Sequence, residues 1–116
     1  MKHGNRNKKF GRVRKVRTAF MRSLARSLAR YGRIETTEAR AKALRPFIER
    51  LVTHAKTGTI AARRHTSRRM GSVDGADLLF KNIGKKYEKR AGGYTRIVKT
   101  GFRKSDGAKR AVIEFV

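Results

Sequence analysis

Lysine and arginine are the residues of this chain whose number and spacing suit a chemical role, the binding of negatively charged groups. The 116 residues include 32 Lys and Arg but only 8 Asp and Glu, so the net charge is +24. So much like charge on a small body repels itself, and its natural partner is a polyanion. Arg22, Arg26 and Arg30 recur at every fourth position, which on a helix places them on one face, about 6 Å apart along the axis. This spacing suits contacts with successive backbone phosphates; a solvated basic face is the alternative.

The start of the chain forms a separate basic segment. Residues 1–17 have a basic residue at almost every second position and few large apolar groups, so burial cannot offset the entropy cost of ordering them. We predict an arm over residues 1–17 that is disordered when free and ordered on a phosphate backbone. A solubilising tail and an Arg-rich transit peptide are the alternatives, although Ser is scarce here. The candidate contacts in the arm are Lys2, His3, Arg6, Lys8, Lys9, Arg12, Arg14, Lys15 and Arg17.

Two further groups of residues suit contact with a nucleic acid. Residues 50–73 contain no acid. Their candidate contacts are Arg63, Arg64 and Arg68. Tyr94 and Arg96 project from the same side if they lie on a strand, where a ring and a guanidinium can stack on unpaired bases. A core or sheet-edge position for Tyr94 is the alternative.

The residue types that catalysis, cofactors and metals need are not grouped in the sequence. The chain has no Cys, hence no disulfide and no thiol nucleophile. The acids are scattered, whereas a two-metal nuclease needs several converging carboxylates. His54 and His65 have no further ligand at metal-binding spacing, and Gly92-Gly93 reads as a turn rather than a phosphate-binding loop. We therefore expect no enzyme, no cofactor, no metal and no small-molecule substrate.

The apolar residues do not indicate a membrane protein. No apolar run approaches the roughly 18 residues of a membrane span. A cationic amphipathic helix on an anionic membrane is a physical option. However, the rest of the chain supplies a core for the apolar face of such a helix, so we expect no membrane partner.

The first helix is predicted over residues 18–31, with Gly32 as its C-terminal stop. Phe20, Leu24, Leu28 and Tyr31 fall on one face of this helix, opposite the three arginines at positions 22, 26 and 30. Phe20, Leu24 and Leu28 are expected to join the core. The residues that follow, 33–36, are short and compatible with a strand.

The second helix is predicted to begin after a Thr36 or Thr37 cap and to end near Lys56, closed by Gly58. Pro46 inside it should cause a kink or a break. The apolar stripe of this helix is Ala41, Leu44, Phe47, Ile48, Leu51 and Ala55, with Val52 at its edge.

The remaining elements complete an α+β domain. Thr59 is expected to cap a third helix that runs to Met70, and Asp74 a fourth that ends before Gly92. The fourth helix should bury one face, formed by Leu79, Phe80, Ile83 and Tyr87. Residues 94–99 and 110–116 have strand composition, joined by a hairpin loop longer than two residues. We therefore predict one domain over residues 18–116, with three to four helices packed on a small three-stranded antiparallel or mixed sheet.

Several segments together resemble one bacterial family, that of large-subunit ribosomal protein number seventeen. The most specific are Arg33-Ile34-Glu35-Thr36-Thr37 and Gly92-Gly93-Tyr94-Thr95-Arg96. Residues 1–3, 41–45 and 111–116 are also similar, so the resemblance extends over nearly the whole chain and keeps its order. The matched segments add four candidate RNA contacts: Arg33, Thr36, Thr37 and Lys42.

The resemblance implies a structural constituent of the large ribosomal subunit in the cytoplasm. It implies binding to ribosomal RNA near the exit of the peptide tunnel, contact with neighbouring large-subunit proteins, and an α+β fold. A small basic nucleoid-type protein that binds DNA is the competing class, because phosphate charge is common to RNA and DNA.

Overall fold

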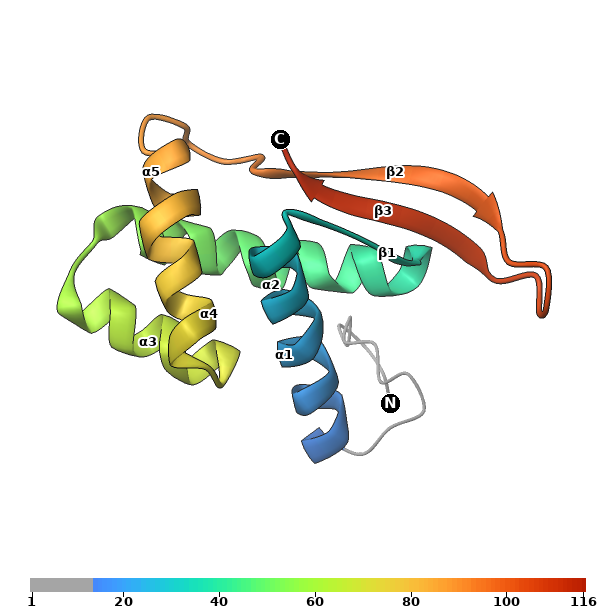
Figure 1. Cartoon of the computed structure of the whole chain (residues 1–116), viewed down its shortest axis with the longest axis horizontal. Helices are drawn as coiled ribbons and strands as arrows, with labels where there is room; N and C mark the ends of the chain where they lie inside the picture. The colour runs from blue at the N-terminus through green and yellow to red at the C-terminus, as the bar shows by residue number, and fades with distance from the viewer. Residues whose placement is uncertain (1–13) are drawn as a thin grey trace, which may run out of the picture.

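The structure, a computed structural model, describes residues 14–116. Within this range, helices cover one face of a three-stranded antiparallel sheet (Figure 1), which confirms the predicted α+β class. Six of the predicted arm contacts lie outside the described residues: Lys2, His3, Arg6, Lys8, Lys9 and Arg12.

Helix α1 (Arg14–Tyr31) begins earlier than predicted. Its first residues are good helix formers with no Gly or Pro among them, so Arg14, Lys15 and Arg17 are helical rather than part of an irregular arm. The buried face is also rotated. It is centred on Ala25, Leu28 and Ala29, whose small alanines allow close helix packing, whereas Phe20 and Leu24 are only half-buried. Tyr31, at the last position of the helix, is 67% exposed.

Helix α2 (Glu38–Thr57) crosses beneath the sheet and forms the centre of the fold (Figure 1). The hydroxyl of Thr37 caps it by accepting a hydrogen bond from the Arg40 N–H at 3.4 Å, and Gly58 ends it with φ 70°. The helix continues through the exposed Pro46, so the expected alternative of a break is wrong. The predicted apolar stripe is buried, apart from a half-buried Phe47.

Helix α3 (Ile60–Met70) matches its prediction. The Thr59 hydroxyl accepts from the Ala62 N–H at 3.1 Å, and Gly71 forms the C-cap with φ 65°. The cap of the next helix, α4 (Val73–Leu78), differs from the prediction. Ser72 caps it by accepting from the Gly75 N–H at 3.1 Å. Asp74 lies instead in the first turn, where a negative charge is favoured by the helix dipole.

Helix α4 continues into a π-helical segment, η1 (Leu79–Ile83), and then into the short α5 (Gly84–Lys86). This wider turn was not predicted. It maintains a continuous buried face, in which Leu79, Phe80 and Tyr87 are at most 7% exposed. The helical run ends before Gly92, as predicted.

The sheet contains β1 (Arg33–Thr37), β2 (Thr95–Phe102) and β3 (Lys109–Phe115) in the order β1-β3-β2. Ile34 pairs with Ile113, and Ile113 with Ile97, so all three strands direct apolar side chains toward the helices at the same level. The β2–β3 hairpin extends beyond the helical layer (Figure 1). Its loop is longer than two residues, as predicted. The Arg103 N–H closes this loop by donating to the Ala108 carbonyl at 2.8 Å.

One hydrophobic core joins the helices to the sheet. Leu28 from α1, Leu44 and Ile48 from α2, and Ile113 from β3 are all 0% exposed. In the described part of the chain, no helix is both long and apolar enough to cross a membrane.

Candidate nucleic-acid interface

The cations of the sheet are mostly paired with carboxylates. On the face away from the helices, Arg96 Nε donates to Glu114 Oε1 at 2.7 Å, and Arg33 Nε lies 4.0 Å from the other oxygen of that carboxylate. The hydrogen bond from Arg96 lowers the pKa of Glu114 below its ordinary value. Arg110 pairs with Glu35 in the same layer. The two carboxylates of the strands, Glu35 and Glu114, therefore partly offset the charge of the five strand cations.

The predicted contacts in the matched segment around β1 also have partners within the protein. Lys42 Nζ lies 2.9 Å from Glu38, and its hydrogen bond lowers the pKa of that carboxyl group. Thr37 caps α2, and Thr36 pairs with Ala111 in the sheet. Arg33 and Lys42 thus have ion-pair partners that the motif alone did not indicate, whereas the cap by Thr37 is one of the two that the sequence predicted.

Helices α1 and α3, in contrast, contain no acid. The two helices contact each other, so their positive charges belong to neighbouring elements of the fold. We call this the α1–α3 surface and define it by the residues Arg14, Lys15, Arg17, Arg26, Arg30, Arg64, Arg68 and Arg69, all at least partly exposed. Arg63 is also on α3, but it lies 3.8 Å from Asp77 and 5.1 Å above the Phe80 ring.

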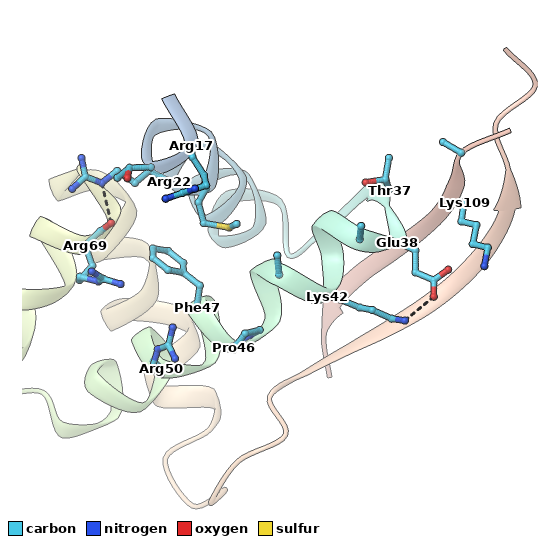
Figure 2. Close-up of a pocket in the computed structure, with 15 residues that line it drawn as sticks. Arg17, Arg22, Thr37, Glu38, Lys42, Pro46, Phe47, Arg50, Arg69 and Lys109 are labelled. Carbon is cyan, nitrogen blue, oxygen red and sulfur yellow. Dashed lines mark hydrogen bonds and ion pairs between the residues drawn. The ribbon is translucent and has the colours of Figure 1, made fainter. Parts of the chain in front are cut away.

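Arg22 has a structural role that separates it from Arg26 and Arg30. Its guanidinium is directed across to α3, where Nε donates to the Arg69 carbonyl at 3.2 Å (Figure 2). Nη2 donates to the Arg68 carbonyl at 3.0 Å. A cation at these final carbonyls is favoured by the helix dipole. Arg22 is half-buried, whereas Arg26 and Arg30 are exposed. Arg22 thus differs from Arg26 and Arg30 in its bonds to α3, which the spacing of the three arginines did not indicate.

Tyr94 is a core residue, and the prediction that its ring stacks on bases is wrong. It is 2% exposed and packs against the Tyr87 ring at a centroid distance of 5.3 Å. Lys56 Nζ donates to its hydroxyl at 2.9 Å, and this hydrogen bond lowers the pKa of Tyr94. The Tyr94 hydroxyl in turn donates to the Arg90 carbonyl at 3.3 Å. Arg96 is exposed on the opposite face of the sheet, so the two residues do not form a joint platform.

A groove of about 1210 Å³ follows the outer side of α2, between α1, the end of α3 and the start of β3 (Figure 2). We call it the α2 groove. Its apolar lining includes Met21, Pro46 and Phe47, and its cations are Arg17, Arg22, Lys42, Arg50, Arg69 and Lys109. The sequence patterns did not assign four of these residues to a binding site: Phe47, Arg50, Arg69 and Lys109. Residues 42, 46 and 50 are spaced four apart and lie on the solvent side of α2. This spacing could have indicated the part of the groove that α2 lines.

The two histidines of the folded part lie together at the far end of α2. The rings of His54 and His65 are 4.4 Å apart between centroids. Burial, followed by the neighbouring His54, lowers the pKa of His65 below its ordinary value. Among residues 14–116, no group of three or more His, Cys, Asp or Glu side chains could hold a metal ion.

Fold and charge distribution together define the class of small, strongly basic α+β proteins, and comparison with known sequences identifies the family. The ribosomal protein L17 family matches residues 20–116. The large ribosomal subunit protein bL17 of Gemmatimonas aurantiaca is 49% identical over 116 residues, which cover 100% of this chain and 98% of that protein. The bL17 protein of Methylacidiphilum infernorum is 50% identical over 115 residues, covering 99% and 88% respectively. The chain therefore belongs to the ribosomal protein L17 family.

Proposed function

We propose that this chain is a structural, non-catalytic component of the large ribosomal subunit in the cytoplasm. It binds ribosomal RNA and stabilises the RNA fold near the exit of the peptide tunnel, beside neighbouring ribosomal proteins. Family membership and the printed names of its relatives support the ribosomal part of this proposal.

The observation that carries RNA binding is the contrast between the sheet, where carboxylates lie against the arginines, and the acid-free α1–α3 surface. On the sheet, Glu35 and Glu114 offset Arg33, Arg96 and Arg110. On α1 and α3 no carboxylate of either helix offsets the arginines, so RNA phosphates supply the missing negative charge. Each phosphate neutralised releases condensed counterions, which makes such binding strongly dependent on salt.

The N-terminal segment extends this surface in the proposal. Residues 1–13 precede Arg14 directly and contain Lys2, Arg6, Lys8, Lys9 and Arg12 without an acid. Their proposed role is to contact further RNA phosphates.

Sedimentation of the tagged full chain in a cell lysate tests the proposal. The chain should co-migrate with large ribosomal subunits, and a chain lacking residues 1–13 should do so poorly while still unfolding cooperatively. Co-migration with the nucleoid instead would support the DNA-binding alternative and overturn the proposal.

Salt dependence gives a second test. If about 6–10 phosphates are neutralised, affinity for a ribosomal RNA fragment should fall by roughly 10³–10⁵ between about 50 and 200 mM salt. At the higher salt the chain should still prefer folded ribosomal RNA to duplex DNA of equal length. Equal affinity for the two would count against a ribosomal role.

A further inference from the structure

We propose that the α2 groove binds a single-stranded segment of RNA and seats one unstacked base against Phe47. This inference rests on the proposed RNA-binding function and assigns part of it to a defined place. The cations of the groove would hold the phosphates, and its apolar floor would hold the base.

The charge of the groove determines what can occupy it. Its lining has the six cations named above and one carboxylate, Glu38. That carboxylate is bound to Lys42 at 2.9 Å and lies 3.6 Å from Lys99, so it does not offset the others. Low-dielectric walls of one charge sign concentrate ions of the opposite sign. An RNA backbone, which carries one negative charge per phosphate, is therefore attracted to the groove.

Phe47 makes an unpaired base the fitting ligand. Its half-buried ring lies in the lining of the groove together with Pro46 (Figure 2), and Met21 also lines the groove. The guanidinium carbon of Arg69 is 5.4 Å from the centroid of that ring. Unpaired RNA bases stack on aromatic rings and on Arg planes. In a duplex the base faces are covered by their neighbours, so a paired base has no face to offer Phe47.

Arg22 acts here as a positioning residue. By donating to the carbonyls of Arg68 and Arg69, it attaches the C-terminal end of α3 to α1. This contact fixes the backbone from which the Arg69 side chain reaches Phe47. The aromatic and cationic parts of the groove are thus held in place before RNA arrives, which reduces the entropy cost of binding.

The groove also has a continuation suited to the next nucleotide. A smaller hollow of about 180 Å³ shares Phe47, Arg50 and Arg69 with it and ends at His54 and His65. Two flat imidazole rings 4.4 Å apart provide a second stacking surface along the same strand of RNA.

A binding experiment with the full chain tests the aromatic contact. The probe is a short fluorescein-labelled single-stranded RNA, compared with an RNA duplex of equal length. Phe47→Leu keeps an apolar side chain but removes the ring face. It should weaken single-strand binding about fivefold or more and leave duplex binding unchanged. Phe102→Leu is the matched control, because Phe102 is 70% exposed on the hairpin, outside the groove, and should change neither.

Two further measurements do not depend on how well Phe47→Leu folds. Arg50→Gln should reduce the salt slope of single-strand binding by about 1, more than Lys81→Gln, which removes an exposed charge outside the groove. Photo-crosslinking of the unaltered chain to RNA containing thiouridine should label the segment 43–50, which includes Phe47.

The outcomes separate this inference from the function on which it rests. If the chain binds RNA and enters large subunits, but Phe47→Leu matches Phe102→Leu and crosslinks avoid residues 43–50, only the groove assignment is wrong. If an acidic peptide occupies the groove in place of RNA and the crosslinks disappear, the site is a protein-docking site and the inference also fails. If the full chain binds no RNA at all, the proposed function itself fails.

Discussion

Glu49, in the middle of α2, accepts two hydrogen bonds from Thr95 at the start of β2. Its Oε2 lies 3.1 Å from the Thr95 backbone N and 2.8 Å from the hydroxyl oxygen. Thr95 is 2% exposed, so this one carboxylate satisfies both polar groups where water has little access. The contact fixes the sheet to the helix on which the α2 groove is built.

We expect Glu49→Ala to destabilise the fold by about 1–3 kcal/mol, because a buried N–H and a buried hydroxyl lose their acceptor. Glu49→Gln, which keeps an acceptor oxygen, should cost less. Urea denaturation measures both. Glu88→Ala is the control, since Glu88 is exposed. If Glu88→Ala destabilised the fold as much as Glu49→Ala, the loss would come from a general change of charge rather than from the contact with Thr95.

Leu28→Ala should cost roughly 2–5 kcal/mol, because Leu28 is 0% exposed at the centre of the α1 face. That is a large part of the stability of a domain of this size. Leu24→Ala should cost less, since Leu24 is half-buried, and Tyr31→Ala should change stability by no more than about 0.5 kcal/mol. Chemical denaturation of the three variants gives the ranking. A larger effect at Leu24 than at Leu28 would mean that α1 is turned differently in solution.

The arginines of α1 should separate into a structural and a surface class. Arg22→Ala removes two hydrogen bonds to α3 and should destabilise the fold by about 0.5–1.5 kcal/mol. Arg26→Ala with Arg30→Ala should leave stability within about 0.5 kcal/mol and reduce the salt slope of RNA binding by up to about 2. Thermal melts and binding titrations on the same preparations measure both properties. Equal destabilisation by all three changes would contradict the separation.

The hairpin loop should show a pH dependence set by Asp106. The hydrogen bond from Arg103, followed by one from the Ala108 N–H, lowers the pKa of Asp106 from 3.8 to about 2. Because its pKa is lower in the folded loop than in an unfolded chain, Asp106 stabilises the loop at a pH above about 4. This stabilisation is lost as the pH falls from about 4 toward 2. The carboxyl carbon shift of Asp106, followed by NMR, should titrate near pH 2. A midpoint near 3.8, as in an unfolded chain, would show that the pair does not persist in solution.

The features that the sequence predicted depend on residues close together in the chain. The caps by Thr37 and Thr59 are bonds to backbone N–H groups three residues away, and the α2 stripe follows from helical periodicity alone. The features that it missed depend on distant partners. Arg22 binds carbonyls 46 and 47 residues away, and Tyr94 is buried partly through Lys56, 38 residues away. No local pattern distinguishes a surface arginine or tyrosine from one with such a partner.

The candidate nucleic-acid interface was likewise predictable only where it depends on residues close together in the chain. Charge alone identified α1 and the acid-free stretch that contains α3 as the cationic elements. The α2 groove was not predictable, because Phe47, Arg69 and Lys109 come from three elements that only the fold brings together. Neutralisation of Arg96 and Arg33 by Glu114 likewise required the strand register, which pairs Glu114 with both residues.

Gly84 should resist substitution, although it lies in a helix, where Ala is normally the better residue by about 1 kcal/mol. A Cβ at Gly84 would lie 2.9 Å from the Ala55 carbonyl oxygen and 3.1 Å from its carbon. These are backbone atoms of α2 and cannot move aside as a side chain can. We therefore expect Gly84→Ala to destabilise the fold by about 1–3 kcal/mol through overpacking.

Gly75 offers the matched control for that prediction. A Cβ there would also meet an atom at 2.9 Å, but this atom is the terminal methyl carbon of Met70, a flexible side chain. Gly75→Ala should therefore cost less than Gly84→Ala, and urea denaturation of the two variants tests the order. Gly84 directly follows the π-helical segment η1, so η1 lies just before the point where α5 comes closest to α2. If Gly84→Ala were instead stabilising, as helix propensity alone predicts, α5 would have to lie farther from α2 than the structure has it.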